Sequence, residues 1–151
     1  MKLSTKSTYG LRAMLNIALE ADKGAISTLD ISKREGISVT YLEQLLNRLR
    51  HKGLVESVRG PKGGYVLSKR PDKITVADIV NSLEENMSTS HCATIHKGTN
   101  RICKRESGCV PKLVWVKLAK AISDCLESMT LGDLTSEAQR IDSDTKKRRL
   151  S

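Results

Sequence analysis

The residues of this chain best suited to chemistry are three cysteines in one stretch, Cys92, Cys103 and Cys109, with ten and then five residues between them. Thiolates at such separations can converge on one iron-sulfur cluster when the backbone between them is a free loop. Lysines and arginines interleaved with them favour the thiolate form. The spacing lacks the close Cys-X-X-Cys pairs of structural zinc sites. The three thiols therefore predict an iron-sulfur cluster.

A fourth ligand for this cluster stays open. His91 and His96 flank the first cysteine and are candidates, although a single histidine in a loop is more often a bystander. The fourth cysteine, Cys125, falls on an apolar helix seam and is expected to be a buried structural thiol. The chain begins without a signal-peptide pattern and has no apolar run of membrane-spanning length, so we expect a cytoplasmic protein without a membrane partner, whose thiols stay reduced.

The charge is concentrated in two places. The 151 residues carry a formal net charge of +9, from 26 Lys+Arg against 17 Asp+Glu. Between Asn47 and Arg70 there are seven basic residues against Glu56 alone, a net +6, and Arg140 to Ser151 adds +3. The rest of the chain is neutral as a whole. A compact run of cations predicts an anionic partner, and nucleic acid fits it better than a membrane.

Three helices are expected before that basic run. Apolar periodicity predicts the first over Ser7–Ala21. Ser27 with Asp30 has the capping-box pattern for a short helix over Thr28–Glu35, and Gly36 supplies the turn that follows. Ser38 then caps a third helix that runs to about Lys52.

This third helix has two unlike faces. Valine and leucines at helical spacing form the face that must meet the core, and no apolar residue interrupts the other face. Short polar side chains in the first turns of such a helix can reach base edges in the major groove. Our candidates for DNA contact on this helix are Thr40, Tyr41, Glu43, Gln44 and Arg48. For Glu43 a plain solvated position remains equally open, because its carboxylate repels phosphate.

A β-hairpin is expected next. Leu54–Val58 and Gly64–Leu67 are short strand-like runs, and a glycine- and proline-rich tip joins them. Arg59 beside Gly60 is suited to insertion into a narrow minor groove, because glycine lets the backbone approach closely. Lys62 is expected to contact phosphate. Two short helices, a glycine turn and a basic hairpin predict a winged helix-turn-helix that binds double-stranded DNA.

The second half of the chain is expected to carry a linker and a dimer helix. Thr75 with Asp78 caps a helix that ends near Leu83, and the aperiodic cysteine loop follows. A long last helix is expected from Pro111 to about Met129. Its apolar seam has the alternating spacing of helices that pair with a partner helix, so we expect a homodimer. The predicted interface residues are Trp115, Leu118, Ile122, Cys125 and Met129.

Together these features predict a mainly α fold with a small β-hairpin: a winged helix-turn-helix with a long C-terminal dimerisation helix. The expected divisions are a DNA-binding domain over residues 1–86, a cysteine-bearing cluster loop over 87–110, a dimerisation helix over 111–134 and a disordered basic tail over 135–151. Two other classes stay open: a repressor without cofactor, or with zinc, whose cysteines act as a redox switch, and a small redox enzyme. The sequence offers neither a nucleophile beside a base nor a glycine-rich nucleotide loop, which disfavours an enzyme.

Three stretches resemble the Rrf2 family of transcription regulators, and within it the regulators of iron-sulfur cluster assembly. They are KLSTKSTYGLRAMLNIAL, DISKREGISVTYLEQLLNRLRHKGLVESVRGPKGGYVLSK and VWVKLAKAISDCLESMTLGDL. The resemblance implies a winged-helix dimer with a crossing dimer helix, whose cluster state changes which promoters it binds, with iron-sulfur biogenesis or redox stress genes as targets. It places Thr40, Tyr41, Glu43 and Gln44 in the recognition helix and Arg59 with Gly60 in the wing. It also makes Cys92, Cys103 and Cys109 the cluster ligands.

Two departures from this resemblance concern the cluster. The interval between the first two cysteines is longer than is usual in these relatives. The histidine ligand of these relatives lies three residues after the last cysteine, where this chain has Lys112, a poor iron ligand. The fourth ligand therefore stays open between His91, His96, a carboxylate and water. Relatives with a four-iron cluster use an aspartate near the N-terminus, and the corresponding place here, near Thr8, does not supply it. A two-iron (2Fe-2S) cluster is therefore the prediction.

Overall fold

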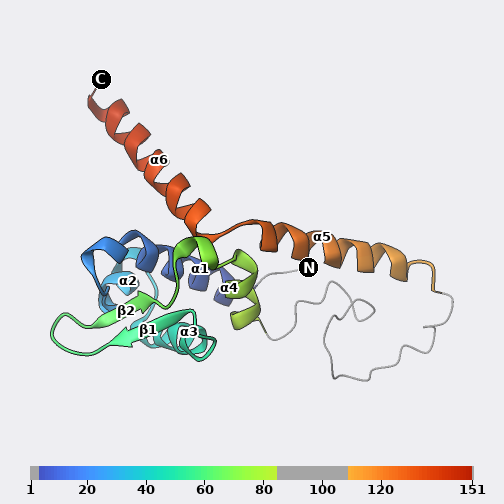
Figure 1. The fold of residues 1–151 in the computed structure, drawn as a ribbon, viewed down its shortest axis with the longest axis horizontal. Coiled ribbons are helices and arrows are strands. Elements are labelled where there is room, and N and C mark those ends of the chain that lie inside the picture. Colours follow the sequence, from blue (N-terminus) through green and yellow to red (C-terminus); the bar gives the residue numbers. More distant parts are fainter. Residues whose placement is uncertain (1–3, 85–108, 151) are drawn as a thin grey trace.

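A computed structural model of the chain describes residues 4–84 and 109–150 (Figure 1). The elements, in order, are α1 (Thr5–Leu19), η1 (Ala21–Lys23), α2 (Thr28–Glu35), α3 (Val39–His51), β1 (Val55–Val58), β2 (Gly64–Leu67), η2 (Pro71–Lys73), α4 (Val76–Leu83), α5 (Lys112–Ser128) and α6 (Leu131–Leu150). The architecture is mainly α with one antiparallel hairpin, as the sequence predicts. The predicted bounds of α2 and α4 coincide with the structure, and those of α1, α3 and the strands agree within about two residues.

Local sequence explains where the short helices begin. The side chains of Ser27, Ser38 and Thr75 each accept a hydrogen bond from the backbone N–H three residues on, which satisfies one of the donors that a helix start leaves free. At α4 the bond is reciprocal, because the carboxylate of Asp78 also accepts from the Thr75 N–H at 2.9 Å. These caps fix the starts of both helices of the helix-turn-helix and of α4.

The core lies between α1, α3, α4 and the base of the hairpin. Met14 and Ile17 of α1 and Leu46 of α3 are fully buried within it, and Ile79 and Leu83 of α4 close it on another side. It is built from aliphatic side chains, since the chain contains no Phe. This core holds α3 with one face inward and the polar face outward, which is the arrangement that DNA reading requires.

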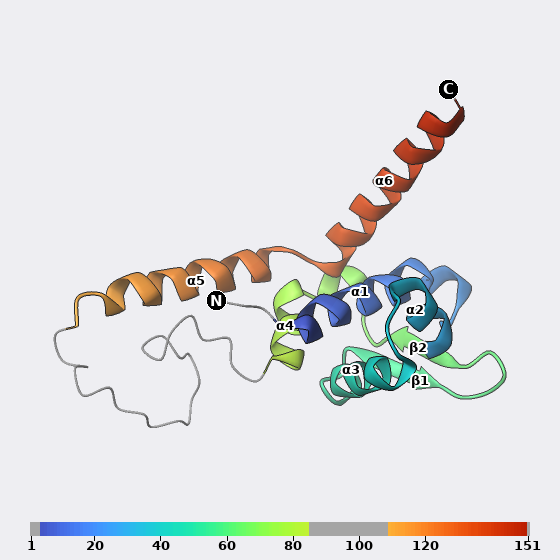
Figure 2. The same cartoon turned by 180° about the vertical axis from the view of Figure 1, so that it is seen from behind.

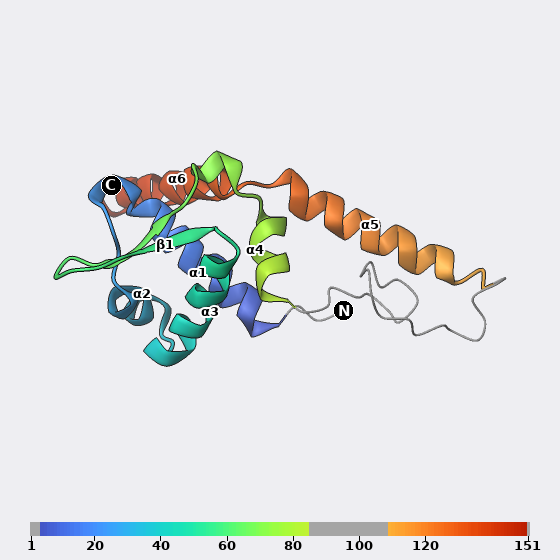
Figure 3. The ribbon, with the colours of Figure 1, turned by 60° about the horizontal axis from the view of Figure 1, so that its bottom comes forward.

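The hairpin projects from the end of the molecule opposite to α5 (Figure 3). Val55 of β1 pairs with Leu67 of β2, and Val58 pairs with Gly64 next to the tip. The hairpin follows α3 closely, because the Leu54 N–H donates to the Leu49 carbonyl at 3.0 Å. The last turn of α3 therefore fixes the base of the hairpin.

The two C-terminal helices leave the body in different directions (Figures 1 and 2). α5 packs against α4, whereas the start of α6 packs against α1 and η2. Met129 and Leu131, on either side of the turn between α5 and α6, bond to the chain where α4 begins. The Val76 N–H donates to the Met129 carbonyl, and the Leu131 N–H donates to the Ile74 carbonyl, both at 2.8 Å.

The expectation of a disordered tail over residues 135–151 is wrong for the described part of that range, which continues α6 as far as Leu150. The helix starts before that range, where Leu131 is fully buried and Thr130 caps the first turn by accepting from the Asp133 N–H. Ion pairs one turn apart, such as Lys146 with Asp142 at 2.7 Å, support the exposed part. A boundary at residue 134 therefore cuts through a helix.

Candidate nucleic-acid interface

The recognition helix of the predicted helix-turn-helix is α3. Its N-cap, Ser38, accepts from the Tyr41 N–H at 3.2 Å, and its leucines at 42, 45, 46 and 49 are buried. The side chains of Thr40, Glu43 and Gln44 are exposed on the opposite face of its first turns. Buried leucines thus fix the helix by one face and leave these polar side chains free for a partner.

A polar network holds α2 against α1. The side-chain N–H of Asn16, which is buried, donates to Glu35 at 2.7 Å and to the Arg12 carbonyl at 3.0 Å. Arg34 reaches back to Glu20 at 2.9 Å, and Lys23 pairs with the same carboxylate. Hydrogen bonds from Lys23 and Arg34 hold the pKa of Glu20 below its usual range. The first helix of the helix-turn-helix is thereby fixed before any DNA is present.

Tyr41 differs from the other predicted base readers because it is half-buried. Its ring meets the Tyr9 ring edge to face, with centroids 6.2 Å apart, and its hydroxyl lies 3.4 Å from the Thr5 Oγ1. The guanidinium carbon of Arg12 lies over the Tyr9 ring, 5.7 Å from its centroid. Such aromatic pairs contribute about 0.5–1.5 kcal/mol beyond the area they bury. Tyr41 therefore ties the start of α3 to α1.

Arg48 lies at the other end of α3 and is also half-buried. Its guanidinium donates to the Leu83 carbonyl, in the last turn of α4, at 3.4 Å. Cations near the C-terminal end of a helix interact favourably with its dipole and its free carbonyls. The structure thus places Arg48 between the recognition helix and α4, rather than on the open face with Gln44.

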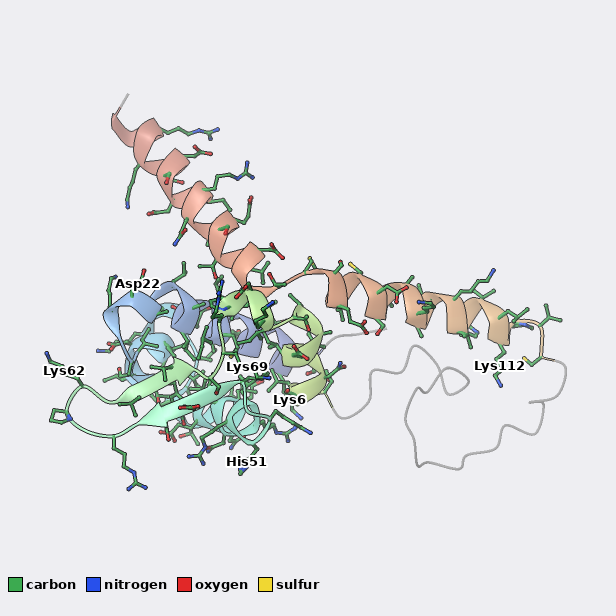
Figure 4. All side chains as sticks on the ribbon, viewed as in Figure 1. Lys6, Asp22, His51, Lys62, Lys69 and Lys112 are labelled. Carbon is green, nitrogen blue, oxygen red and sulfur yellow. The ribbon has the colours of Figure 1, made fainter. Side chains whose placement is uncertain are left out.

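The wing places its cations at the tip. Arg59, Gly60 and Lys62 are exposed, and Figure 4 shows the Lys62 side chain pointing away from the body. The tip is closed by the Gly63 N–H, which donates to the Gly60 carbonyl at 2.9 Å, and Gly60 has a φ of 117° that side chains disfavour. Among the described residues, no carboxylate forms an ion pair with Arg59 or Lys62. Within the described part of the chain, these two charges are therefore open to an anion.

The cysteine cluster falls mostly outside the described residues, which exclude Cys92, Cys103, His91 and His96. Cys109 is described: its thiol is half-buried, and its carbonyl accepts from the Lys112 N–H at 3.1 Å as α5 begins. Within residues 4–84 and 109–150, no group of three His, Cys, Asp or Glu side chains is placed to hold a metal. Cys125 is exposed on α5, so the expectation of a buried thiol is wrong for a single protomer.

The predicted dimer residues lie on α5 or, in the case of Met129, directly after it, and the apolar side chains of this helix are largely uncovered. Trp115, Leu118 and Met129 are exposed, whereas Ile122 is partly buried against its own chain, near the buried Ala119. The sequence reasoning missed other exposed apolar side chains in the first turns of the helix, Leu113, Val114 and Val116, although the unbroken run LVWV signals them. It also missed Val110, which is exposed just before the helix. No helix in the described part of the chain is long and apolar enough to cross a bilayer.

Residues 3–137 match the model of the Rrf2 family, which is described as an iron-dependent transcriptional regulator. This chain belongs to the Rrf2 family. The HTH-type transcriptional regulator IscR of Klebsiella pneumoniae (strain 342) is 38% identical over 142 residues, which cover 94% of this chain and 84% of the relative. IscR of Erwinia tasmaniensis is 40% identical over 139 residues, covering 92% and 81%.

Solved structures of Rrf2-type regulators share the fold. CymR, described as the global cysteine regulator of B. subtilis, superposes with a TM-score of 0.74 at 36% identity, over 91% of this chain and 98% of CymR. IscR of T. potens gives a TM-score of 0.72 at 38% identity, over 91% and 88%. The predicted winged-helix class and the family are thereby confirmed. The chain is a DNA-binding transcription regulator, and its relatives are regulators, not enzymes.

Proposed function

We propose that this Rrf2 member binds duplex DNA as a homodimer, with α3 in the major groove and the β1–β2 wing at the minor groove, under the control of an iron-sulfur cluster on Cys92, Cys103 and Cys109. The observation that carries the DNA contact is the outer face of α3. Its first turns are capped, fixed from behind by buried leucines, and lined with exposed polar side chains next to a hairpin whose tip carries exposed cations. Base edges and phosphates match this combination.

The DNA contacts are tested by two substitutions with different expected signatures. Gln44→Ala should cost about 1–3 kcal/mol on a duplex selected by the wild-type protein from a random pool, and little on unselected DNA, because a base contact discriminates sequences. Lys62→Ala should weaken both duplexes alike and reduce the salt slope by about one, as the loss of one phosphate contact does. Fluorescence anisotropy over a salt series measures both. Equal losses on the two duplexes for Gln44→Ala would remove Gln44 from base reading.

The homodimer is supported by the uncovered apolar surface of α5. Leu113 and Val114 are 63% and 61% exposed, and Leu118 follows one turn after Val114 on the same side of the helix. Contiguous apolar surface of this kind marks an interaction site. A second copy of the same helix offers the same apolar stripe, and two recognition helices are what a pair of DNA half-sites about 34 Å apart requires.

The cluster is supported by the chemistry of its donors. Three cysteine thiolates suit an iron-sulfur cluster, and Cys109 lies just before the N-terminal end of α5, where the helix dipole favours a thiolate. When bound, the cluster would supply redox and oxygen sensitivity. The chain contributes the thiols and their connections: the cysteine segment joins α4, which packs against α1 and α3, to the dimer helix α5. A two-iron cluster with a fourth ligand from His91 or His96 is our preferred form.

A second candidate keeps the DNA contacts but replaces the cluster with zinc or with free thiols that act as a redox switch. One observation favours it: the solved neighbours include Staphylococcus aureus CymR in an oxidized form, 34% identical with a TM-score of 0.70. The two candidates differ in what the protein carries after purification without oxygen. A cluster gives visible charge-transfer absorption with iron and sulfide, whereas zinc or thiols leave the protein colourless.

The cysteine assignment is tested in the same preparation. Cys92→Ala, Cys103→Ala and Cys109→Ala should each abolish the chromophore and shift the affinity for the selected duplex in the same direction. Cys125→Ser, on the exposed face of α5, is the matched control and should keep the cluster. Protein that holds iron and sulfide, but whose three variants bind DNA as the wild type does, would show that the cluster does not govern binding.

A further inference from the structure

The wing of this protein is held on both of its sides. β2 pairs with β1 along one edge, and Tyr65 in β2 also forms an antiparallel bridge with Ile26 along the other edge. That bridge has both hydrogen bonds: the Tyr65 N–H donates to the Ile26 carbonyl at 2.9 Å, and the Ile26 N–H donates to the Tyr65 carbonyl at 3.2 Å. Ile26 is itself buried, so the bridge is a fixed point of the body.

Gly64 is the residue that makes this approach possible. A Cβ added there would collide with the carbonyl group of Ile26 and would lie 2.8 Å from the Ser27 nitrogen. These are backbone atoms, which cannot rotate away as a flexible side chain can. Any side chain at position 64 must therefore move β2 away from Ile26 or break the bridge.

The segment that β2 meets leads directly into the helix-turn-helix. Ser27 is the N-cap of α2 and accepts from the Asp30 N–H at 3.1 Å, and α2 packs against α3. The other strand, β1, is tied to the end of α3 through Leu54. The wing thus has two backbone anchors, one at each helix of the helix-turn-helix.

We propose that Gly64 is a positioning residue of the DNA interface. Because it has no side chain, β2 can pair with Ile26, and this pairing sets the place of Arg59 and Lys62 relative to the recognition helix. The inference rests on the proposed contact of the wing with DNA, but the bridge itself can be tested without DNA.

The first experiment measures amide hydrogen exchange in the full-length protein. In Gly64→Ala the amides of Ile26 and Tyr65 should exchange at least about tenfold faster than in wild type, while the buried amides of α3 stay protected. The control is Gly24→Ala, which also replaces a glycine of positive φ but has nothing within 4 Å of its added Cβ. Unchanged exchange at Ile26 and Tyr65 in Gly64→Ala would overturn the proposal.

Should Gly64→Ala fail to fold, the wild-type exchange rates decide. The Ile26 and Tyr65 amides must then be as protected as those paired within the β1–β2 ladder. If they exchange as fast as the amide of Lys62 at the exposed tip, the second anchor is not rigid and Gly64 does not position the wing.

The second experiment asks whether the position of the wing matters for binding. Arg59→Ala should reduce affinity for the selected duplex by about 5- to 150-fold in the wild-type and Gly24→Ala backgrounds. In Gly64→Ala the same substitution should cost less than about twofold, because Arg59 is already misplaced. An equal Arg59 effect in all three backgrounds would overturn the positioning role. If Arg59→Ala costs nothing in wild type, the proposed wing contact fails, and the exchange experiment still decides what Gly64 does.

Discussion

The body of this protein and its helix α5 differ in how much apolar surface they expose to solvent. The body comprises α1–α4, the hairpin and the first turn of α6, and its large apolar side chains are mostly inside, with Met14, Leu46 and Ile79 fully buried. Along α5, by contrast, Ala119 is the one buried residue, and leucine, valine and tryptophan side chains lie exposed. The surface that the body leaves open is polar and basic, which suits DNA. The surface that α5 leaves open is apolar, which suits another protein chain.

The two surfaces therefore suit different kinds of partner. They also differ in whether one chain is enough to form them. The polar face of α3 is complete in one protomer, because its cap and its leucine anchors come from the same chain. The apolar face of α5 is left open in one chain, and burying it in the proposed dimer would supply about 25 cal/mol for each Å² removed from water. We therefore expect the dimer to form before DNA binds and independently of it. The following substitutions separate the two surfaces.

The largest effect is expected from charges placed on the α5 stripe. Val114→Glu combined with Leu118→Glu should convert the dimer into monomers, because each change removes about 1.5–3 kcal/mol of apolar burial and forces a carboxylate into the interface. Analytical ultracentrifugation measures the mass, and far-UV circular dichroism should show that the body remains folded.

The matched control for this double variant is Lys120→Glu. It makes the same change of two charge units on α5, and it replaces the exposed ion pair of Lys120 with Asp124 by two acidic side chains that both stay in water. This control should stay dimeric. If the double Glu variant also stays dimeric, the exposed stripe is not the interface, and the contrast between body and α5 has another cause.

The second prediction tests how much of α6 belongs to the body. Leu131 is fully buried, so Leu131→Ala should lower the free energy of unfolding by about 2–5 kcal/mol through lost burial and the cavity it leaves. Ile141 lies on the same helix but is 57% exposed, so Ile141→Ala should change the free energy of unfolding by less than about 0.5 kcal/mol. Urea unfolding at matched protein concentration compares them. Equal losses would mean that α6 is packed along its whole length.

These helices also show what sequence reasoning reaches. α2 and α4 were predictable to the residue because their signals are local: a capping residue, an acid three positions on, and a short apolar period. α6 was not, since its polar composition is typical of disorder. What makes it a helix is partly remote, namely the place in the core that Leu131 fills against η2 and α1. A composition-based argument cannot contain that contact.

The features of the candidate site likewise fall into those that local sequence predicts and those that depend on distant residues. The exposed positions of Thr40, Gln44 and Arg59 follow from helix period and turn chemistry, which the sequence contains. The half-buried places of Tyr41 and Arg48 do not, because their partners Tyr9 and Leu83 are more than thirty residues away in the chain. The bridge between Tyr65 and Ile26 was not predicted either, because these two residues are also far apart in the chain. Long-range contacts, more than local pattern, decide which polar residues remain free.

The third prediction concerns Glu84, which closes the body where α1 and α4 meet. Its Oε1 accepts from the Ser4 N–H at 3.0 Å and from the hydroxyls of Ser4 and Ser7. Burial alone would raise the pKa of Glu84, but the hydrogen bonds from Ser4 and Ser7 outweigh it and hold the pKa below its usual range. A carboxylate with a lowered pKa stabilises the fold above its unfolded pKa, and this stabilisation is lost as the pH falls through the folded pKa.

Glu84→Gln should therefore be less stable than wild type by about 1 kcal/mol at neutral pH, since hydrogen bonds to a charged acceptor are the stronger ones. The difference should shrink in acid, as wild-type Glu84 becomes protonated. Urea unfolding across a pH series measures it. The control is Glu56→Gln, an exposed position in β1 that should change stability by less than about 0.5 kcal/mol. A loss that is constant across the series would mean that the charge of Glu84 is not what stabilises the junction.

The smallest effect is expected in the exposed part of α6, where stability is local. Asp142 pairs with Lys146 at 2.7 Å, both side chains are largely in water, and such a pair contributes about 0.3–0.5 kcal/mol to a helix. Asp142→Asn should reduce the helical circular dichroism signal slightly without moving the urea midpoint of the body. Because salt screens exposed charges, wild type and variant should converge at about 1 M salt, where the Debye length is near 3 Å. A shift of the midpoint would instead show that this part of α6 is coupled to the core, which would extend the body beyond the first turn of that helix.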